Sequence, residues 1–264
     1  MPRFAANLSM MFTERPFLDR FQAAKAAGFD AVECWFPTEY GRREIADRLT
    51  DLNLPMVVIN TAYGAGEEWG LAALPGREGA FRESIDEALE HAAALGNCSV
   101  HVMAGLAGQV SRDAALDTYK ANLEHAVRRA EGSGIQLLIE PLNRHDRPGY
   151  LLSSVGQAAE IIESTGLHDL KIMFDCYHVE MEEGDLLARM RGIWPKIGHI
   201  QIAGVPTRGA PTDGRVDYAA LFEEIDRLGW AGWVGAEYRP TGITEESLGW
   251  LPARRPGSDR QRIL

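Results

Sequence analysis

Hydrophobic and polar positions follow two alternating patterns along the chain, short apolar runs and longer amphipathic stretches. The short runs predict eight strands, at Arg3–Leu8, Ala31–Cys34, Met56–Asn60, Ser99–Met103, Gln136–Glu140, Lys171–Asp175, Gly198–Ile202 and Trp233–Glu237. The longer stretches predict helices between strands, at Phe17–Ala27, Glu44–Leu52, Arg77–Leu95, Asp113–Glu131, Ser154–Ser164 and Tyr218–Leu228. In the third of these helices, apolar residues recur at helical spacing from Phe81 to Ala92, which predicts one face packed on a sheet.

Glycine follows several predicted helices just before the next strand, as in AAGFDAVE, ALGNCSV and GSGIQLLIE. Glycine is common there because it adopts the left-handed conformation that ends a helix. Repeated strand–helix alternation predicts parallel strands joined by helical crossovers. Eight units without a linker favour a closed (β/α)₈ barrel over an open α/β sheet, as one domain of residues 1–264 with a tail from about residue 250.

Two segments are longer than ordinary connections. Thr61–Gly76 is rich in glycine and alanine and contains Trp69, and Gly204–Val216 is rich in glycine and proline. Loops of this length in compact domains are often lids or binding loops. We expect the first to cover a site.

Composition narrows the class of protein. The chain has 264 residues, 45% hydrophobic, and a formal net charge of −11, which argues against nucleic acid as a partner because phosphate backbones bind clustered cations. Three cysteines without metal-ligand spacing predict reduced thiols. No apolar run is long enough to span a bilayer and the first residues do not resemble a signal peptide, so we expect no membrane association and a cytoplasmic location.

Oxygen-bearing side chains end four of the last strands. Glu140, Asp175, Gln201 and Glu237 would meet at the carboxyl-terminal rim of a barrel, where active sites lie. This donor set suits a hard divalent cation, Mg²⁺ or Mn²⁺, and clustering three carboxylates without one would be costly. In the alternative interpretation, nearby arginines (Arg144, Arg208 and Arg239) neutralise the carboxylates in a structural ion-pair network.

The two glutamates suggest proton-transfer chemistry. If Glu140 and Glu237 flank a bound α-hydroxycarbonyl compound, one removes a proton, a metal-stabilised enediolate forms, and a proton returns at the next carbon. His178 follows Asp175 by three residues, on what we expect to be a loop turning back over the site. His101 and Glu33 also end strands and are candidate substrate contacts. Each has a competing structural interpretation: core packing for His101 and a helix cap for Glu33.

Several segments, in order, resemble the hydroxypyruvate isomerase family of the xylose isomerase-like barrels, which includes 2-oxo-tetronate isomerases. They include RFAANLSMMF, GLAALPGREGAFRESI, LLIEPLNRHDRPGY, KIMFDCYHVEMEEGDL, KIGHIQIAGVP and GWVGAEYRPTGITEESLGWL. The resemblance implies a (β/α)₈ barrel, a Mg²⁺-type site at the four strand-end residues, and Glu140 and Glu237 as proton donor and acceptor. Similarity to the related ketose 3-epimerases implies that His178 and Arg208 contact the substrate.

Three positions depart from the family pattern, and all lie near the expected substrate. Ala210 and Arg215 replace acids that family members commonly carry, and Glu180 replaces a glutamine. These changes leave the reaction type intact and the identity of the substrate open. An arginine at position 215 favours a more anionic substrate.

The predicted function is a metal-dependent isomerase for a small sugar acid, converting hydroxypyruvate to tartronate semialdehyde or 2-oxo-tetronate to 3-oxo-tetronate. A ketose 3-epimerase is the first alternative, although epimerases of this superfamily usually have histidine where Gln201 stands. A non-catalytic sugar-binding barrel is an alternative of another class. Barrels of this kind often self-associate, so a homo-oligomer is one expected state.

Overall fold

Eight parallel strands form the centre of the protein, in the order β2-β1-β8-β7-β6-β5-β4-β3. The structure, a computed structural model, describes residues 1–37, 40–66, 68–108 and 110–252. The strands are β1 (Arg3–Asn7), β2 (Ala31–Glu33), β3 (Val58–Asn60), β4 (Ser99–His101), β5 (Leu137–Ile139), β6 (Lys171–Asp175), β7 (Ile197–Ile202) and β8 (Trp233–Ala236). Most of the predicted tail from about residue 250 lies outside the described residues.

The sheet closes between β2 and β3. Val32 forms a parallel bridge with Met56, and the Val32 N–H donates to the Pro55 carbonyl at 2.9 Å. On the other side of the bridge, the Val57 N–H donates to the Val32 carbonyl, also at 2.9 Å. This closure confirms the predicted barrel and excludes the open sheet.

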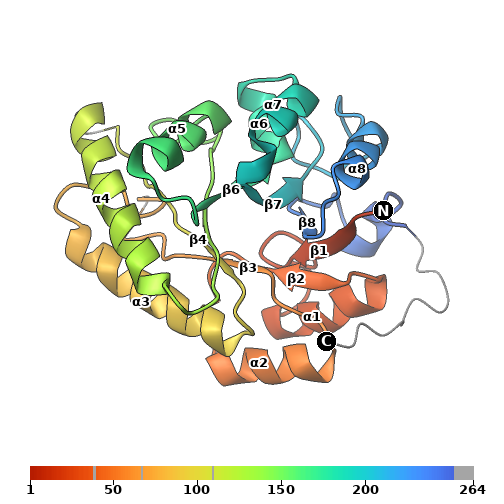
Figure 1. Ribbon diagram of the computed structural model, residues 1–264. Coiled ribbons are helices and arrows are strands. Elements are labelled where there is room, and N and C mark those ends of the chain that lie inside the picture. The colour runs from red at the N-terminus through yellow and green to blue at the C-terminus, as the bar shows by residue number, and fades with distance from the viewer. Residues whose placement is uncertain (38–39, 67, 109, 253–264) are drawn as a thin grey trace.

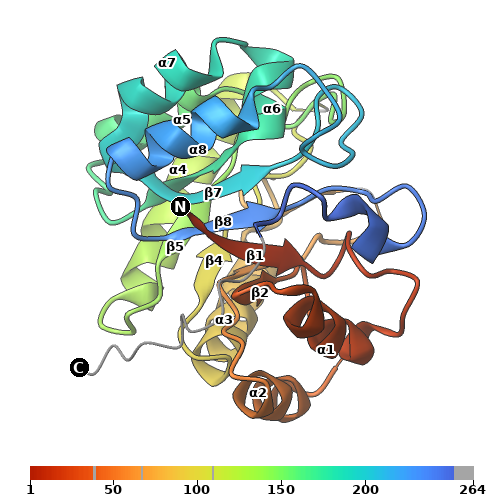
Figure 2. The ribbon, with the colours of Figure 1, turned by 90° about the vertical axis from the view of Figure 1, so that its right-hand side faces the viewer.

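Helices surround the ring of strands, as Figures 1 and 2 show. They are α1 (Phe17–Ala27), α2 (Arg42–Asp51), α3 (Glu78–Ala94), α4 (Arg112–Ala130), α5 (Val155–Thr165), α6 (Cys176–Glu182), α7 (Leu186–Ile193) and α8 (Tyr218–Arg227). The sequence pattern did not predict α6 and α7. Both are short, and α6 begins directly after β6 without the polar linker that marks other helix starts.

The barrel interior changes from apolar to polar along the strands. A buried apolar layer includes Ala5, Ala31, Val58, Leu138 and Met173. Side chains two residues apart in a strand share a face, so the next interior position on each of these strands lies nearer the carboxyl end. Those positions hold buried polar residues, namely Asn7, Glu33, Asn60, Glu140 and Asp175. The strand period therefore builds a polar layer at one end of an apolar core.

The segment Thr61–Gly76 is fastened to the chain that follows β4. Gly70 forms an antiparallel bridge with Ala104, and the Ala73 N–H donates to the Ala104 carbonyl at 2.7 Å. Gly70 has a φ of +119°, and a Cβ built there would lie 2.4 Å from the Met103 carbonyl oxygen. Only glycine allows the two segments to approach so closely.

None of the described helices is long and apolar enough to cross a membrane.

We expect Gly70→Ala to lower the free energy of unfolding by about 2 kcal/mol more than Gly66→Ala does, because overpacking adds to backbone strain. Gly66 also has a positive φ, of +63°, but nothing lies within 4 Å of a Cβ built there, so it is the matched control. Urea denaturation of both variants provides the measurement. Equal losses in the two variants would contradict the close-approach argument.

Candidate active site

Glu140, Asp175 and His178 come together at the carboxyl end of the strands. One ligating atom from each lies within 4.8 Å of the others. Asp175 ends β6, and its Oδ1 accepts the Tyr177 N–H at 2.8 Å, which caps α6. His178 therefore lies in the first turn of a helix, so its expected position on a loop is wrong. The helix brings its Nε2 to 3.7 Å from Asp175 Oδ2.

The surroundings of His178 determine which of its ring nitrogens carries the proton. The Asn143 backbone N–H donates to His178 Nδ1 at 3.1 Å, so Nδ1 carries the lone pair. Burial and the charges of Arg208 and Arg147 hold the pKa of His178 well below its usual value, so the ring is neutral. A neutral ring with a lone pair on Nδ1 carries its proton on Nε2, and it can donate a hydrogen bond toward the site from that atom.

Arg208 bridges two of the carboxylates. Its Nη2 lies 2.5 Å from Glu237 Oε2 and 3.4 Å from Asp175 Oδ2. Glu237 Oε1 accepts hydrogen bonds from Asn7 Nδ2 at 3.0 Å and from Trp35 Nε1 at 2.6 Å. Glu237 thus has a partner on each oxygen. The backbone of Arg208 is unusual as well, with a φ of +54° in the loop after β7. Non-glycine residues in that conformation are strained and cluster at functional sites.

The other two arginines of the ion-pair alternative do not share this role. Arg144 pairs with Glu182 near the surface, and the Arg239 backbone N–H donates to the Arg208 carbonyl at 2.8 Å. A neutralising network of three arginines is therefore not what the structure contains.

Glu33 lies at the centre of a hydrogen-bonded group beside the site. Its Oε1 accepts from Gln201 Nε2 at 2.7 Å and from Asn7 Nδ2 at 3.1 Å, and its Oε2 lies 2.7 Å from His199 Nε2. Helix α2 begins after Gly41 without a side-chain cap, so the cap interpretation of Glu33 is wrong. Both oxygens already have protein partners, and Glu33 holds neighbouring side chains in place.

Two buried oxygens of the site have no hydrogen-bond partner among the described residues, Glu140 Oε1 and Gln201 Oε1. Because Glu33 engages Gln201 Nε2, the amide oxygen of Gln201 is the atom left free. His101 shows the same feature, since both ring nitrogens are buried and unpaired, although Nδ1 lies 3.5 Å from Glu140 Oε2. Unpaired buried polar atoms are rare in folded proteins, and these atoms are free to contact a water, an ion or a substrate at the site.

Electrostatics favour a cation here. Burial, then repulsion from Glu237 and Asp175, raises the pKa of Glu140 well above its usual value. Burial raises the pKa of Asp175 to about 7 even though Arg208 opposes the shift, and burial also raises the pKa of Glu237. One arginine does not balance these carboxylates. Carboxylate and amide oxygens are the ligands of hard divalent cations, so Glu140, Asp175, Gln201 and Glu237 fit such an ion chemically.

A cavity of about 30 Å³ lies against this cluster. Both predicted catalytic glutamates line it, as do three of the predicted substrate contacts, and Glu33 does not. Its wall consists of Trp35, Asn60, Tyr63, Trp69, His101, Met103, Glu140, Leu142, Arg147, His178, Arg208 and Glu237. Neither Arg147 nor Tyr63 was predicted from the sequence. Arg147 lies in the segment LIEPLNRHDRPGY, but no spacing rule connects it to the strand ends.

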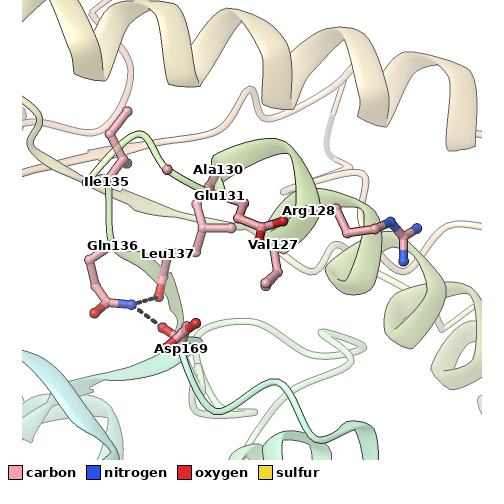
Figure 3. A pocket seen from close by; sticks show the side chains of 10 residues that line it. Val127, Arg128, Ala130, Glu131, Ile135, Gln136, Leu137 and Asp169 are labelled. Carbon is pink, nitrogen blue, oxygen red and sulfur yellow. Dashed lines mark hydrogen bonds between the residues drawn. The ribbon is translucent and has the colours of Figure 1, made fainter.

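A larger hollow of about 480 Å³ lies at the amino-terminal end of β5, between the end of α4 and Asp169 (Figure 3). Gln136 Nε2 donates there to the carbonyls of Leu137 and Asp169. Catalytic groups of barrels lie at the opposite end of the strands, so we assign no active-site role to this hollow.

The departures from the family pattern at positions 180 and 215 form one interaction. Arg215 Nε lies 3.0 Å from Glu180 Oε1, and Arg215 Nη2 donates to the Glu180 carbonyl, also at 3.0 Å. The two substitutions therefore compensate each other in charge. Arg215 does not line the cavity, and nothing in the structure explains Ala210.

Buried carboxylates around a small cavity at the carboxyl end of a (β/α)₈ barrel define an enzyme site. The xylose isomerase-like TIM barrel family matches residues 21–254, and the chain belongs to that family. It is 48% identical over 254 residues to the 2-oxo-tetronate isomerase of Cupriavidus necator, covering 95% of this chain and 98% of that protein. It is 40% identical over 258 residues to the hydroxypyruvate isomerase of Escherichia coli, covering 97% and 100%. The chain is an isomerase.

Solved structures support the same fold. A Brucella melitensis protein described as an AP endonuclease of family 2 superposes with a TM-score of 0.92, at 40% identity, covering 95% of this chain and 98% of that one. An L-ribulose 3-epimerase superposes with a TM-score of 0.77, at 25% identity, covering 94% and 85%. The expected family and barrel are confirmed.

We expect Glu33→Ala to lower the free energy of unfolding by about 2–4 kcal/mol, because it leaves the buried groups of His199 and Gln201 unpaired and removes one of the two acceptors of Asn7 Nδ2. Guanidinium denaturation followed by circular dichroism measures this loss. Glu83→Ala, at an exposed position of α3, is the control and should be close to neutral. A loss below about 0.5 kcal/mol for Glu33→Ala would refute the positioning role.

Proposed function

We propose that the protein is a divalent-metal-dependent sugar-acid isomerase, acting on hydroxypyruvate or 2-oxo-tetronate. One observation carries the proposal: two buried glutamates, Glu140 and Glu237, line a single small cavity beside further oxygen donors. The names of the two relatives at 48% and 40% identity supply the substrate class.

The chemistry is the transfer of one proton between adjacent carbons. In hydroxypyruvate, one glutamate removes a C3 proton, the electron pair moves to form an enediolate, and a proton returned to C2 gives tartronate semialdehyde. In 2-oxo-tetronate, the same transfer from C3 to C2 gives 3-oxo-tetronate. A hydroxyl proton moves between the two oxygens, so each reaction is balanced without an oxidant or a second substrate.

Glu140, Asp175, Gln201 and Glu237 would hold the cation. A bound Mg²⁺ or Mn²⁺ supplies Lewis-acid stabilisation of negative charge on the substrate oxygens. His178 would donate a hydrogen bond from Nε2 to the substrate, and His101 would lie against Glu140 as a further polar contact. Glu33 serves as a positioning residue through Gln201, in place of the substrate contact first expected of it.

The aromatic wall would keep water from the intermediate. Trp35, Tyr63 and Trp69 form a row, with ring centroids 6.3 Å and 5.2 Å apart. The cavity that this wall bounds has a volume of about 30 Å³. A cytoplasmic location and a homo-oligomer remain predictions.

The ketose 3-epimerase alternative receives some support from the L-ribulose 3-epimerase structure at 25% identity. It uses the same pair of glutamates and differs in substrate charge. A panel of hydroxypyruvate, 2-oxo-tetronate and L-ribulose, each assayed with Mg²⁺ or Mn²⁺, separates the two. Turnover of the ketose alone would replace the sugar-acid proposal, and cleavage of an abasic DNA duplex would point to nuclease chemistry.

We expect Glu140→Gln and Glu237→Gln each to lower kcat for the sugar acid by about 10²–10⁴-fold, the usual contribution of a positioned acid or base. Proton NMR in D₂O follows both product formation and deuterium incorporation at the reacting carbon. Glu83→Gln should keep wild-type activity. Wild-type kcat in either active-site variant would rule out the two-glutamate mechanism.

We expect Mn²⁺ to bind the wild-type protein and to stabilise it by about 2.7 kcal/mol at 100 times its dissociation constant, because the folded state gathers the ligands. Titration calorimetry and thermal unfolding with and without Mn²⁺ measure the two effects. Asp175→Asn should weaken both Mn²⁺ binding and the stabilisation by Mn²⁺. Asp86→Asn, on the outer surface of α3, should change neither of these two effects. If Mn²⁺ leaves the wild-type melting temperature unchanged, the cation assignment fails.

A further inference from the structure

Arg147 is held over the cavity by an aromatic ring. It lies seven residues after Glu140, and its guanidinium carbon is 3.6 Å from the centroid of the Trp69 ring. One of its N–H groups donates to the Asp146 carbonyl at 2.7 Å. A guanidinium has five N–H donors in a rigid fork, so most of them remain available. Stacking fixes the fork in one direction at little further cost in conformational entropy.

The charge of Arg147 is not balanced by an ion pair within the described part of the chain. The nearby Asp146 carboxylate accepts hydrogen bonds from Tyr177 Oη at 2.8 Å and from Asn143 Nδ2 at 3.3 Å, and forms no ion pair with Arg147. Burial and then Arg208 lower the pKa of Arg147, Asp146 opposes them, and Arg239 lowers it further, so the net shift is downward. A carboxylate beside the guanidinium would offset the repulsion from Arg208 and Arg239.

Three other arginines near the site are paired with carboxylates, and Arg239 does not line the cavity. Arg208 contacts Asp175 and Glu237, and Arg144 pairs with Glu182. Arg215 pairs with Glu180, outside the cavity wall. Among described residues, Arg147 is the cavity-lining cation without a carboxylate partner.

We propose that Arg147 binds the carboxylate of the substrate and thereby selects sugar acids over neutral sugars. In hydroxypyruvate and 2-oxo-tetronate the carboxylate is attached to C2, one of the two carbons between which the proton moves. The substrate therefore presents its reacting carbons to the glutamates and its carboxylate to the guanidinium, which binds carboxylates through two parallel hydrogen bonds. This inference rests on the proposed function and adds its specificity-determining residue.

The test compares Arg147→Met and Arg147→Lys with Arg144→Met, a control at a surface arginine outside the cavity. Hydroxypyruvate is the acid, and dihydroxyacetone is its neutral counterpart, with CH₂OH in place of the carboxylate. We expect Arg147→Met to raise KM for hydroxypyruvate about 10–100-fold, the usual value of a charged hydrogen-bonded pair, with kcat changed less than about 5-fold. The rate of deuterium exchange into dihydroxyacetone should not change in Arg147→Met. Arg147→Lys should recover part of the affinity for hydroxypyruvate that Arg147→Met loses.

Binding gives a readout that does not require turnover. Glycerate keeps the carboxylate but lacks the carbonyl group, and glycerol lacks both. By calorimetry, Arg147→Met should weaken glycerate binding about 10–100-fold and leave any glycerol binding unchanged, while Arg144→Met should match wild type. Circular dichroism spectra confirm that each variant is folded.

The outcomes separate the two proposals. Arg147-dependent glycerate binding without isomerisation of either sugar acid would end the proposed function and keep the carboxylate site. Wild-type isomerisation with an unchanged KM in Arg147→Met, or a loss confined to kcat, would overturn the role of Arg147. A wild-type protein that binds neither glycerate nor hydroxypyruvate would refute both.

Discussion

The burial of several carboxylates at one end of the barrel is the constraint on which the rest of the site depends. Glu33, Glu140, Asp175 and Glu237 are all buried, and among the described residues Arg208 is the arginine that pairs with two of them. Buried charge is costly unless it is paired and hydrogen-bonded. Glu33 is compensated by three side chains, Glu237 by an amide, an indole and Arg208, and Asp175 by Arg208 and the first turn of α6. Glu140 keeps an unpaired oxygen, so the uncompensated charge is concentrated where a cation and proton transfer are proposed.

The cavity lining combines groups of opposite charge. Glu140 and Glu237 line the cavity, and so does Arg147, which is stacked on Trp69. A small molecule with a hydroxycarbonyl group beside a carboxylate matches this polarity. The loop carrying Trp69 is fixed by the close contact of Gly70 with the chain after β4, so the direction of Arg147 depends on a segment far from it in sequence.

The departures from the family pattern show why single positions are hard to interpret. Arg215 suggested a more anionic substrate when considered alone. The structure pairs it with Glu180, another departure, and the two charges cancel outside the cavity. In the proposal made above, Arg147 selects for an anion instead, and no departure from the family pattern identified it. Glu180 and Arg215 are 35 positions apart in the sequence. Their pairing can be recognised only in the folded protein, where α6 and the loop after β7 are in contact.

The sequence by itself determined the barrel, its strands and the strand-end residues, because the period of two along a strand and the glycine-ended helices are local properties of the chain. It also identified Glu140 and Glu237, since residues that end parallel strands must meet at one rim. It missed α6 and α7, which are both short, and α6 also lacks a polar linker before it. It placed His178 on a loop. The tertiary structure alone decided that Glu33 orients Gln201, that Arg208 joins two carboxylates, and that Arg147 faces the cavity. These depend on side chains from distant strands and loops packing together, and no spacing along the chain encodes those distances.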